Sequence, residues 1–205
     1  MRNTLRSLLA LSLFAGIAAQ AAPSNIDVVK SFMTEIVNLS VDAKNTQGAT
    51  NEESKKKIVQ ISQKIDFIQL AKRSFGARWS KFKESDRKDF IATFEQLLEV
   101  TVYPRAQKIN AKGDSIKYAA MPGKSSVVQV KGQIEQERKG DIVQQDIELQ
   151  LHVDPKTSKI IDVVIEGELL SKNLKRQFDE ALKKKTFGEI ISQMKKRVDE
   201  SKKAN

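Results

Sequence analysis

The chain has 205 residues, no cysteine, a single histidine and a formal net charge of +10. Without cysteine it can form neither a disulfide nor a thiolate metal site, and with His152 alone it cannot build a metal site on two histidines. The surplus of basic residues favours anionic partners. Nucleic acid is the usual anionic partner of a basic protein, but the export signal at the start of the chain argues against it.

The first 21 residues have the three-part layout of a secretory signal peptide. Two arginines precede an apolar run at residues 8–17 (LLALSLFAGI), and residues 19–21 (AQA) offer a cleavage site. The alternative is an uncleaved membrane anchor, but the run is shorter than the roughly 20 residues that span a bilayer. We expect cleavage, a soluble periplasmic product formed by residues 22–205 as one domain, and a net charge that falls by two, to +8.

The mature chain is predicted to start with two helices. Ser24 with Asp27 matches the S-x-x-D pattern of a helix start, and Thr50 with Glu53 forms a second capping pair. After each pair, apolar residues recur every three or four positions, which is typical of a helix with one buried side. The polar residues 42–50 (DAKNTQGAT) predict a loop between the two helices.

A short helix and a long helix are predicted next. Asp66 with Gln69 starts the short helix, and Gly76 is expected to end it in a left-handed conformation. Ser85 starts the long helix, which Pro104 should kink or end because proline lacks a backbone donor.

The hydrophobic pattern then changes to a period of two. Residues 125–134 and 146–153 alternate apolar and polar side chains, and residues 138–141 (RKGD) between them are typical of a hairpin turn. A further strand is predicted at residues 159–166, and residues 114–120 are a candidate edge strand. Strict alternation predicts an antiparallel sheet with one buried face and one solvated face.

Two closing helices are predicted at residues 171–185 and 187–200. The order of helices, meander and helices predicts an α+β domain, in which helices wrap the apolar face of a curved, mostly antiparallel sheet. The apolar sides of the sheet and the helices could fill one another or could enclose an apolar pocket. The pattern alone leaves both interpretations open.

Signatures of catalysis are missing from the sequence. It contains no G-x-S-x-G, H-E-x-x-H or P-loop motif. His152 falls on the polar side of its predicted strand, where we expect a solvated side chain. Asp162 and Glu166 would lie on one strand face about 13 Å apart, which is too far for carboxylates that share a proton. We therefore predict no catalytic residue, no metal site and no enzymatic activity.

Basic residues gather in the last two predicted helices. They could be solvated helix surfaces, or they could form a docking surface for acidic proteins or anionic headgroups. Aromatic residues are not interleaved with them, so a platform for stacking bases is not indicated. The predicted docking residues are Lys183, Lys184, Lys185, Lys195, Lys196 and Arg197.

Three stretches of the chain resemble a known family. Residues 66–79 match the pattern D-F-x-x-[ILM]-A-x-x-x-[LF]-G-x-x-W, residues 162–167 match D-V-x-[IV]-[ED]-G, and residues 177–187 match a Q-F helix pattern. Each motif alone is weak, but their order and spacing together are fairly specific. In these motifs the chain resembles the periplasmic phospholipid-binding MlaC family, also called toluene-tolerance or ABC-transporter auxiliary proteins.

The resemblance implies a fold and a function. The fold would be NTF2-like, with an apolar pocket that takes phospholipid acyl chains and leaves the headgroup outside. The function would be to shuttle phospholipid between an outer-membrane lipoprotein complex and an inner-membrane ABC transporter with an MCE-domain subunit, which maintains the lipid asymmetry of the outer membrane. No cofactor is implied, because the phospholipid is cargo.

The pocket is expected to lie between the sheet and the helices. We predict that strand residues Val128, Val130, Ile147, Leu149, Leu151, Val163 and Ile165 and helical residues Phe94, Leu98, Phe178 and Leu182 bind lipid. Trp79 is predicted to plug the core between helices instead. Two alternatives remain, namely an NTF2-like periplasmic enzyme and an interaction or chaperone module whose core is filled.

Overall fold

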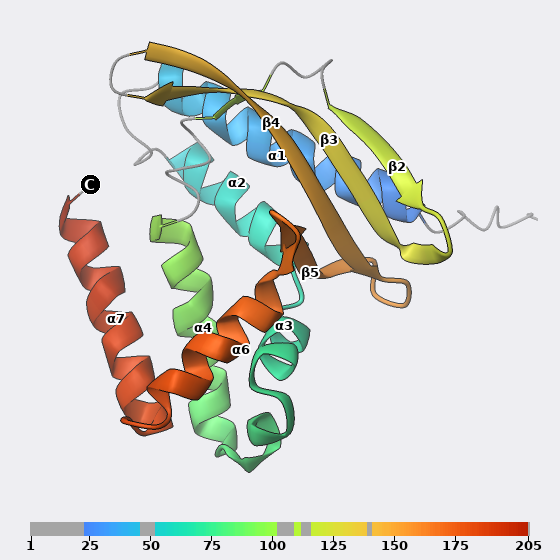
Figure 1. Ribbon diagram of the computed structural model, residues 1–205. Helices are drawn as coiled ribbons and strands as arrows, with labels where there is room; N and C mark the ends of the chain where they lie inside the picture. The colour runs from blue at the N-terminus through green and yellow to red at the C-terminus, as the bar shows by residue number, and fades with distance from the viewer. Residues whose placement is uncertain (1–22, 46–51, 102–108, 112–115, 139–140, 205) are drawn as a thin grey trace, which may run out of the picture.

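The computed structural model describes residues 23–45, 52–101, 109–111, 116–138 and 141–204. Figure 1 shows two parts: a curved sheet with two helices beside it, and a group of helices below. The upper helices are α1 (Asn25–Asn45) and α2 (Glu52–Gln63). The lower part contains α3 (Phe67–Phe75), the 3-10 helix η1 (Gly76–Lys81), α4 (Glu84–Thr101), α6 (Leu170–Ala181) and α7 (Phe187–Ala204).

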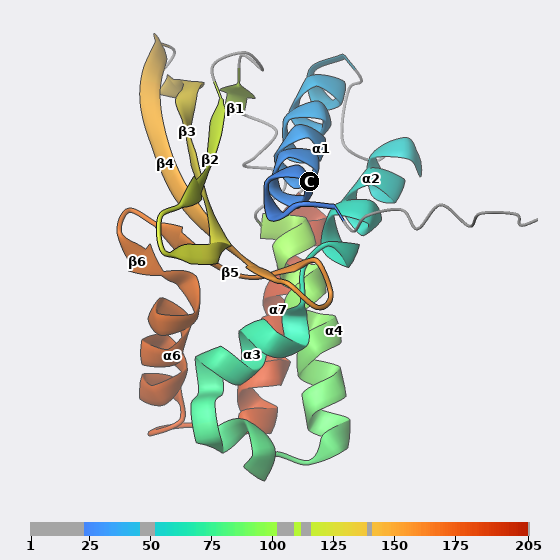
Figure 2. The ribbon, with the colours of Figure 1, turned by 90° about the vertical axis from the view of Figure 1, so that its right-hand side faces the viewer.

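The sheet is antiparallel throughout, which confirms the predicted α+β class with a curved antiparallel sheet. Its order is β1-β3-β4-β5-β6, and β2 also pairs with β3. The long β3–β4 hairpin forms its centre (Figure 2). The strands are β1 (Ile109–Ala111), β2 (Lys117–Met121), β3 (Lys124–Arg138), β4 (Asp141–Asp154), β5 (Lys159–Ile165) and β6 (Glu168–Leu169).

Helix α1 covers part of one face of the sheet, which we call the inner face. The alternating strand pattern places valines and leucines there, and α1 adds Val29 and Met33 from its apolar side. Helix α2 packs on α1 through Ile61, which is fully buried. The resulting sheet cluster consists of Val29, Met33, Val128, Val130, Leu151, Val153 and Ile160.

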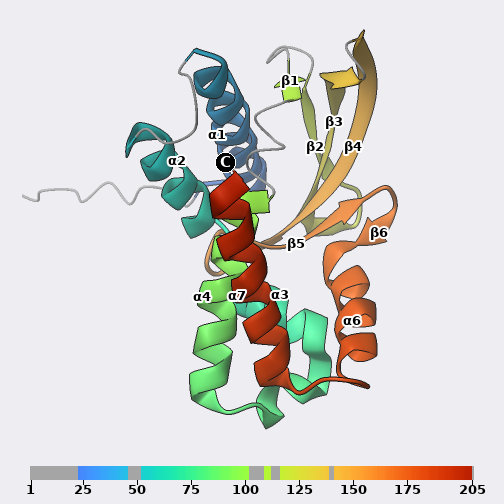
Figure 3. The ribbon, with the colours of Figure 1, turned by 90° about the vertical axis from the view of Figure 1, so that its left-hand side faces the viewer.

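The lower helices, seen below the sheet in Figure 3, have a separate core. Aromatic rings dominate it: Phe75 stacks on Phe178 with centroids 4.3 Å apart, and Phe82 stacks on Phe187 at 3.8 Å. Such ring pairs add about 0.5–1.5 kcal/mol each beyond the area that they bury. The buried members of this aromatic cluster are Phe67, Leu70, Ala71, Phe75, Trp79, Phe90, Phe94, Phe187 and Ile191.

Strand β5 joins the two parts. Ile160 pairs in parallel with Ile65, and its backbone N–H donates to the carbonyl of Lys64 at 2.8 Å while its own carbonyl accepts from the N–H of Asp66 at 2.8 Å. Helices α3 and α6 both contact β5. The chain segment between α2 and α3 is therefore fixed to the sheet by backbone hydrogen bonds.

Several predicted helix starts are confirmed. The N–H of Asp27 donates to the Ser24 hydroxyl at 3.2 Å, and the N–H of Gln69 donates to the Asp66 carboxylate at 2.9 Å. Gly76 ends α3 with a positive φ of 57° as predicted, but its ψ of −136° lies outside the left-handed helical region, and η1 follows it directly. Thr50 and Pro104 lie outside the described residues, so their predicted roles stay predictions.

Some predicted boundaries are wrong. Residues 42–45 continue α1 instead of forming a loop, since Ala43 and Lys44 favour helix. Helix α6 ends at Ala181 instead of residue 185, because a capping box of Thr186 and Glu189 starts α7 right after a turn.

The strand predicted at residues 159–166 also ends early. Glu166 and Gly167 have φ of 52° and 82° and form the two-residue turn between β5 and β6. Positive φ at both positions is the mark of this turn, so Glu166 leaves the strand face that Asp162 occupies.

Candidate functional site

The inner face of the sheet carries rows of aliphatic side chains across three strands. In one row, Val128 of β3 pairs with Leu151 of β4, which pairs with Val163 of β5. The next row runs from Val130 through Leu149 to Ile165, and Ile147 pairs with Gly132 beyond it. The structure therefore brings all seven predicted strand residues onto one face.

Burial varies across this face. Val128, Val130 and Leu151 are nearly inaccessible beneath the helix, whereas Ile147, Leu149 and Val163 are only half-buried. Ile165, at the end of β5, is 47% exposed, and Val143, six positions along β4 from the Leu149 that pairs with Ile165, is 41% exposed. Half-buried and exposed apolar side chains on one sheet face are candidates for a binding surface. We call the half-buried and exposed aliphatic residues of this face the open apolar surface.

The open apolar surface consists of residues from β4 and β5. Its members are Val143, Ile147, Leu149, Val163 and Ile165. Gln145 lies on the same face between Val143 and Ile147, and neither its amide nor the five aliphatic side chains can act as an acid or a base. Val143 was not predicted, because the alternation was assigned only from residue 146 onward, although the same alternation places it on this face.

The four predicted helical residues lie elsewhere. Phe94 is buried in the aromatic cluster, with its ring edge-on to Phe67 at 5.9 Å, and Leu98, Phe178 and Leu182 pack against the same cluster. The structure therefore does not group them with the sheet cluster. The apolar side of each of these helices packs against the neighbouring helices. A role in lipid binding stays a prediction for all four residues.

Sequence reasoning did not assign site roles to α1 and α2. Phe32 and Ile36 of α1 and Ile58 of α2 are half-buried around Ile61, next to the sheet cluster. Their helical spacing was visible in the sequence. The spacing identifies an apolar side but does not say which neighbour that side contacts.

Trp79 packs in the aromatic cluster, where it stacks on Phe75 with centroids 5.8 Å apart and is only 6% exposed. This position agrees with the prediction of a core role. The guanidinium of Arg87 lies 6.0 Å from the centroid of its ring.

The polar face of the sheet holds a buried carboxylate. Asp162 is 2% exposed and accepts hydrogen bonds from the N–H of Ser171 at 3.1 Å and from its hydroxyl at 2.5 Å. The guanidinium of Arg73 lies 3.8 Å away. Asp162 thus caps the start of α6, and its oxygens are occupied by structural partners.

His152 pairs with Asp162 across β4 and β5. Burial lowers the pKa of the imidazole below its ordinary value of 6.5, an effect that nearby Asp162 partly offsets. His152 is half-buried instead of solvated, so that part of its prediction is wrong. Within the described ranges, no cluster of three or more histidine, aspartate or glutamate residues could hold a metal ion.

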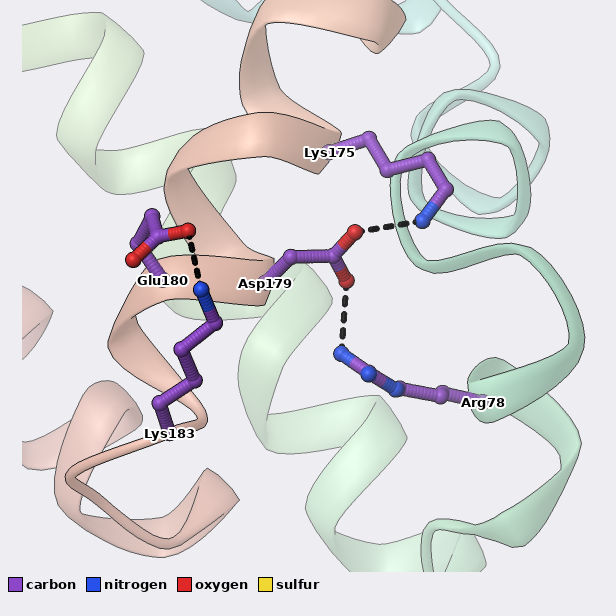
Figure 4. A network of polar contacts seen from close by, with 5 residues as sticks. All are labelled: Arg78, Lys175, Asp179, Glu180 and Lys183. Atoms are coloured by element: carbon purple, nitrogen blue, oxygen red, sulfur yellow. Dashed lines mark hydrogen bonds and ion pairs between the residues drawn. The ribbon is translucent and has the colours of Figure 1, made fainter.

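The six predicted docking residues are all exposed, and several have acidic or polar neighbours. Lys183, in the turn after α6, contacts Glu180 at 2.5 Å (Figure 4). Lys195 contacts Asp89 at 2.8 Å, Lys196 contacts Glu200 at 3.8 Å, and Lys185 donates to Gln193 at 2.8 Å. Figure 4 also shows Asp179 of α6 between Lys175 and Arg78, which ties α6 to η1. A docking role for these residues stays a prediction.

A family model described as MlaC protein matches residues 30–196. The chain belongs to the MlaC family. This range includes all three stretches on which the resemblance rested, and it confirms the resemblance. The match extends over most of α1, the sheet and the first part of α7, so it covers both parts of the molecule.

Several solved structures match the MlaC chain, and one of them resembles it over most of its length. It is the phospholipid-binding protein from Ralstonia solanacearum in complex with a phospholipid, with a TM-score of 0.63 and 17% sequence identity. The likeness covers 87% of this chain and 99% of that chain, and at this identity it shows the fold. No curated protein matches the sequence. Among the residues described, no helix is long and apolar enough to cross a membrane.

Proposed function

We propose that this MlaC protein is a periplasmic, non-enzymatic carrier of phospholipid. It holds the acyl chains against the open apolar surface and leaves the headgroup outside. It carries the lipid between an outer-membrane lipoprotein complex and an inner-membrane ABC transporter with an MCE-domain subunit, and so maintains outer-membrane lipid asymmetry. Membership of the family and the phospholipid complex of the Ralstonia protein support this proposal.

The observation that carries the proposal is the exposure of Val143 and Ile165 on an aliphatic sheet face whose other members are half-buried or buried. Each methylene exposed to water costs about 0.8 kcal/mol, so a two-chain lipid needs a shielded path across the periplasm. An aliphatic surface bounded by the sheet and α1 supplies contacts to acyl chains, and these contacts do not depend on which headgroup the lipid carries. The signal peptide expected at residues 1–21 supports the periplasmic location.

The two alternatives have less support. An enzyme would need a titratable group at the site, and the members of the open apolar surface are all aliphatic. An interaction module with a filled core is consistent with the aromatic cluster, but it would leave the open apolar surface without a role.

Extraction of the purified mature protein with organic solvent, followed by mass spectrometry of lipids, tests the proposal. A carrier yields stoichiometric phospholipid. An enzyme or a filled-core module yields only traces that detergent-free washing removes.

A further inference from the structure

A second apolar depression lies in the lower part of the molecule, outside the sheet. It is a groove of about 380 Å³ between α3, η1 and α4. Its apolar lining is Ile68 of α3, Trp79 of η1, and Ile91 and Ala92 of α4. Ile68 is 53% exposed, which makes it a conspicuous apolar residue on this surface. We call this depression the α3–α4 groove.

Helical spacing produces the shape of the groove. On α4, residues Lys88, Ile91, Ala92 and Glu95 recur every three or four positions and so share one side of the helix. Ile68 and Lys72 are one turn apart on α3 and form a second row of side chains along the groove. A channel between two such rows is complementary to the ridge of a third helix.

The charges around the α3–α4 groove favour an acidic occupant. The charged residues of its rim are Lys72, Arg87 and Lys88, which are basic, and Glu84 and Glu95, which are acidic. On the rim, Lys88 is paired with Glu84 at 2.7 Å, whereas none of the ion pairs among the described residues includes Lys72 or Arg87. Glu95 is the remaining acidic residue of the rim, two turns beyond Lys88 on α4. The basic side of the rim thus has more unsatisfied charge than the acidic side.

We infer that the α3–α4 groove binds an amphipathic helix of a partner protein, with aliphatic side chains against Ile68 and Trp79 and acidic residues toward Lys72 and Arg87. Helix-in-groove recognition uses this combination of an apolar floor and a charged rim. Tryptophan and arginine are also the residue types enriched where binding energy concentrates. The inference goes beyond the proposed lipid carriage and does not depend on it.

Two other occupants fit less well. A second copy of this chain would bring together two molecules that each carry a net charge of +8 after cleavage, which disfavours association. A membrane surface is nearly flat and would leave the floor of a concave groove unfilled. A projecting helix fills it.

A designed peptide tests the inference on the mature full-length protein. The probe is a fluorescein-labelled, stapled helix of about 15 residues, with leucine at i, i+3, i+4 and i+7 and glutamate at its other exposed positions. The matched probe has lysine in place of every glutamate. Fluorescence anisotropy should show saturable binding of the glutamate peptide, and binding of the lysine peptide should be at least about ten-fold weaker.

Variants locate the binding. Ile68→Asp and the double variant Lys72→Glu/Arg87→Glu should each weaken binding of the glutamate peptide about ten-fold or more. Ala92→Trp should also weaken it by filling the groove, and because Ala92 is exposed the fold should be kept. Val59→Asp is the matched control, since Val59 is similarly exposed at 49% but lies on α2, and it should bind the peptide normally.

Three results would overturn the inference. They are no saturation at peptide concentrations up to about 1 mM, equal affinity for the glutamate and lysine peptides, and unchanged affinity of Ile68→Asp and Ala92→Trp variants that are folded by circular dichroism. The last measurement is binding of the protein and its Ile68→Asp variant to vesicles of phosphatidylglycerol and phosphatidylethanolamine. If vesicle binding, but not peptide binding, depends on Ile68, the groove is a membrane contact and the inference is wrong.

Discussion

Ser171, in the first turn of α6, donates both its backbone N–H and its hydroxyl to the carboxylate of Asp162 on β5. The contact joins the sheet to the lower helices, and it lies where a helix N-terminus favours negative charge. Arg73 of α3 approaches the same carboxylate at 3.8 Å. Helix α3, which is distant in sequence, therefore meets β5 and α6 at one buried anion.

Replacing Ser171 should destabilise this joint. In Ser171→Ala the hydroxyl hydrogen bond to a buried carboxylate is lost, and we expect the free energy of unfolding to fall by about 1.5–3 kcal/mol. Urea denaturation followed by circular dichroism measures the change. Ser80→Ala, an exposed serine of η1, is the control and should change stability little. Equal stability of the two variants would show that the hydroxyl hydrogen bond to Asp162 contributes nothing.

The pH dependence of stability should contain a contribution from His152. Since burial lowers the pKa of the folded imidazole below 6.5, the unfolded chain binds the proton more readily. This contribution is therefore fully present above pH 6.5 and is lost as the pH falls below that value toward the folded pKa. In His152→Gln, urea melts from pH 7.5 to pH 5 should show a smaller loss of stability. A steeper loss in the variant would mean that the protonated imidazole is stabilised in the fold.

Trp79 should be insensitive to lipid. Its ring is buried against Phe75 in the aromatic cluster, away from the open apolar surface. The emission maximum of its fluorescence should therefore stay constant when phospholipid is added to delipidated protein. Because Trp79 is the single tryptophan, the signal has one source. A shift on lipid addition would place lipid, or a change that lipid causes, at the aromatic cluster.

The lysines of the turn between α6 and α7 should affect docking and leave lipid content unchanged. Charge reversal of residues 183–185 to glutamate should slow lipid transfer to partner complexes and reduce its salt dependence, because exposed charges act mainly on association rate. Lipid recovered from the variant should equal that of the wild type. A variant that loses its lipid, and transfers at a normal rate once reloaded, would assign these lysines to the pocket or the fold.

Sequence patterns predicted the inner face well and its surroundings poorly. Alternation at Ile147, Leu149 and Leu151 decides which side of a strand is apolar, because strand side chains alternate strictly. The apolar stripes of Phe94 and Phe178 were equally clear, but a helical stripe does not specify its partner. These rings meet Phe75 and Phe67 in the aromatic cluster instead of the sheet.

Local chemistry explains the other differences. Glu166 continues the strand pattern by position, yet Gly167 beside it permits the tight turn that removes Glu166 from the strand. Strand β1 has three residues, too few to show alternation. The α3–α4 groove depends on how two helices pack, which no single periodic segment encodes.

The measurement that tests lipid binding at the open apolar surface most directly is the amount of phospholipid that co-purifies with two matched variants. Ile165→Asp places a carboxylate on that surface, where a bound acyl chain would strip it of water. Ile68→Asp makes the same change at a similarly exposed isoleucine in the α3–α4 groove. Mass spectrometry of solvent extracts should show wild-type phospholipid in Ile68→Asp and at least about ten-fold less in Ile165→Asp. Full lipid in a folded Ile165→Asp variant would contradict the account.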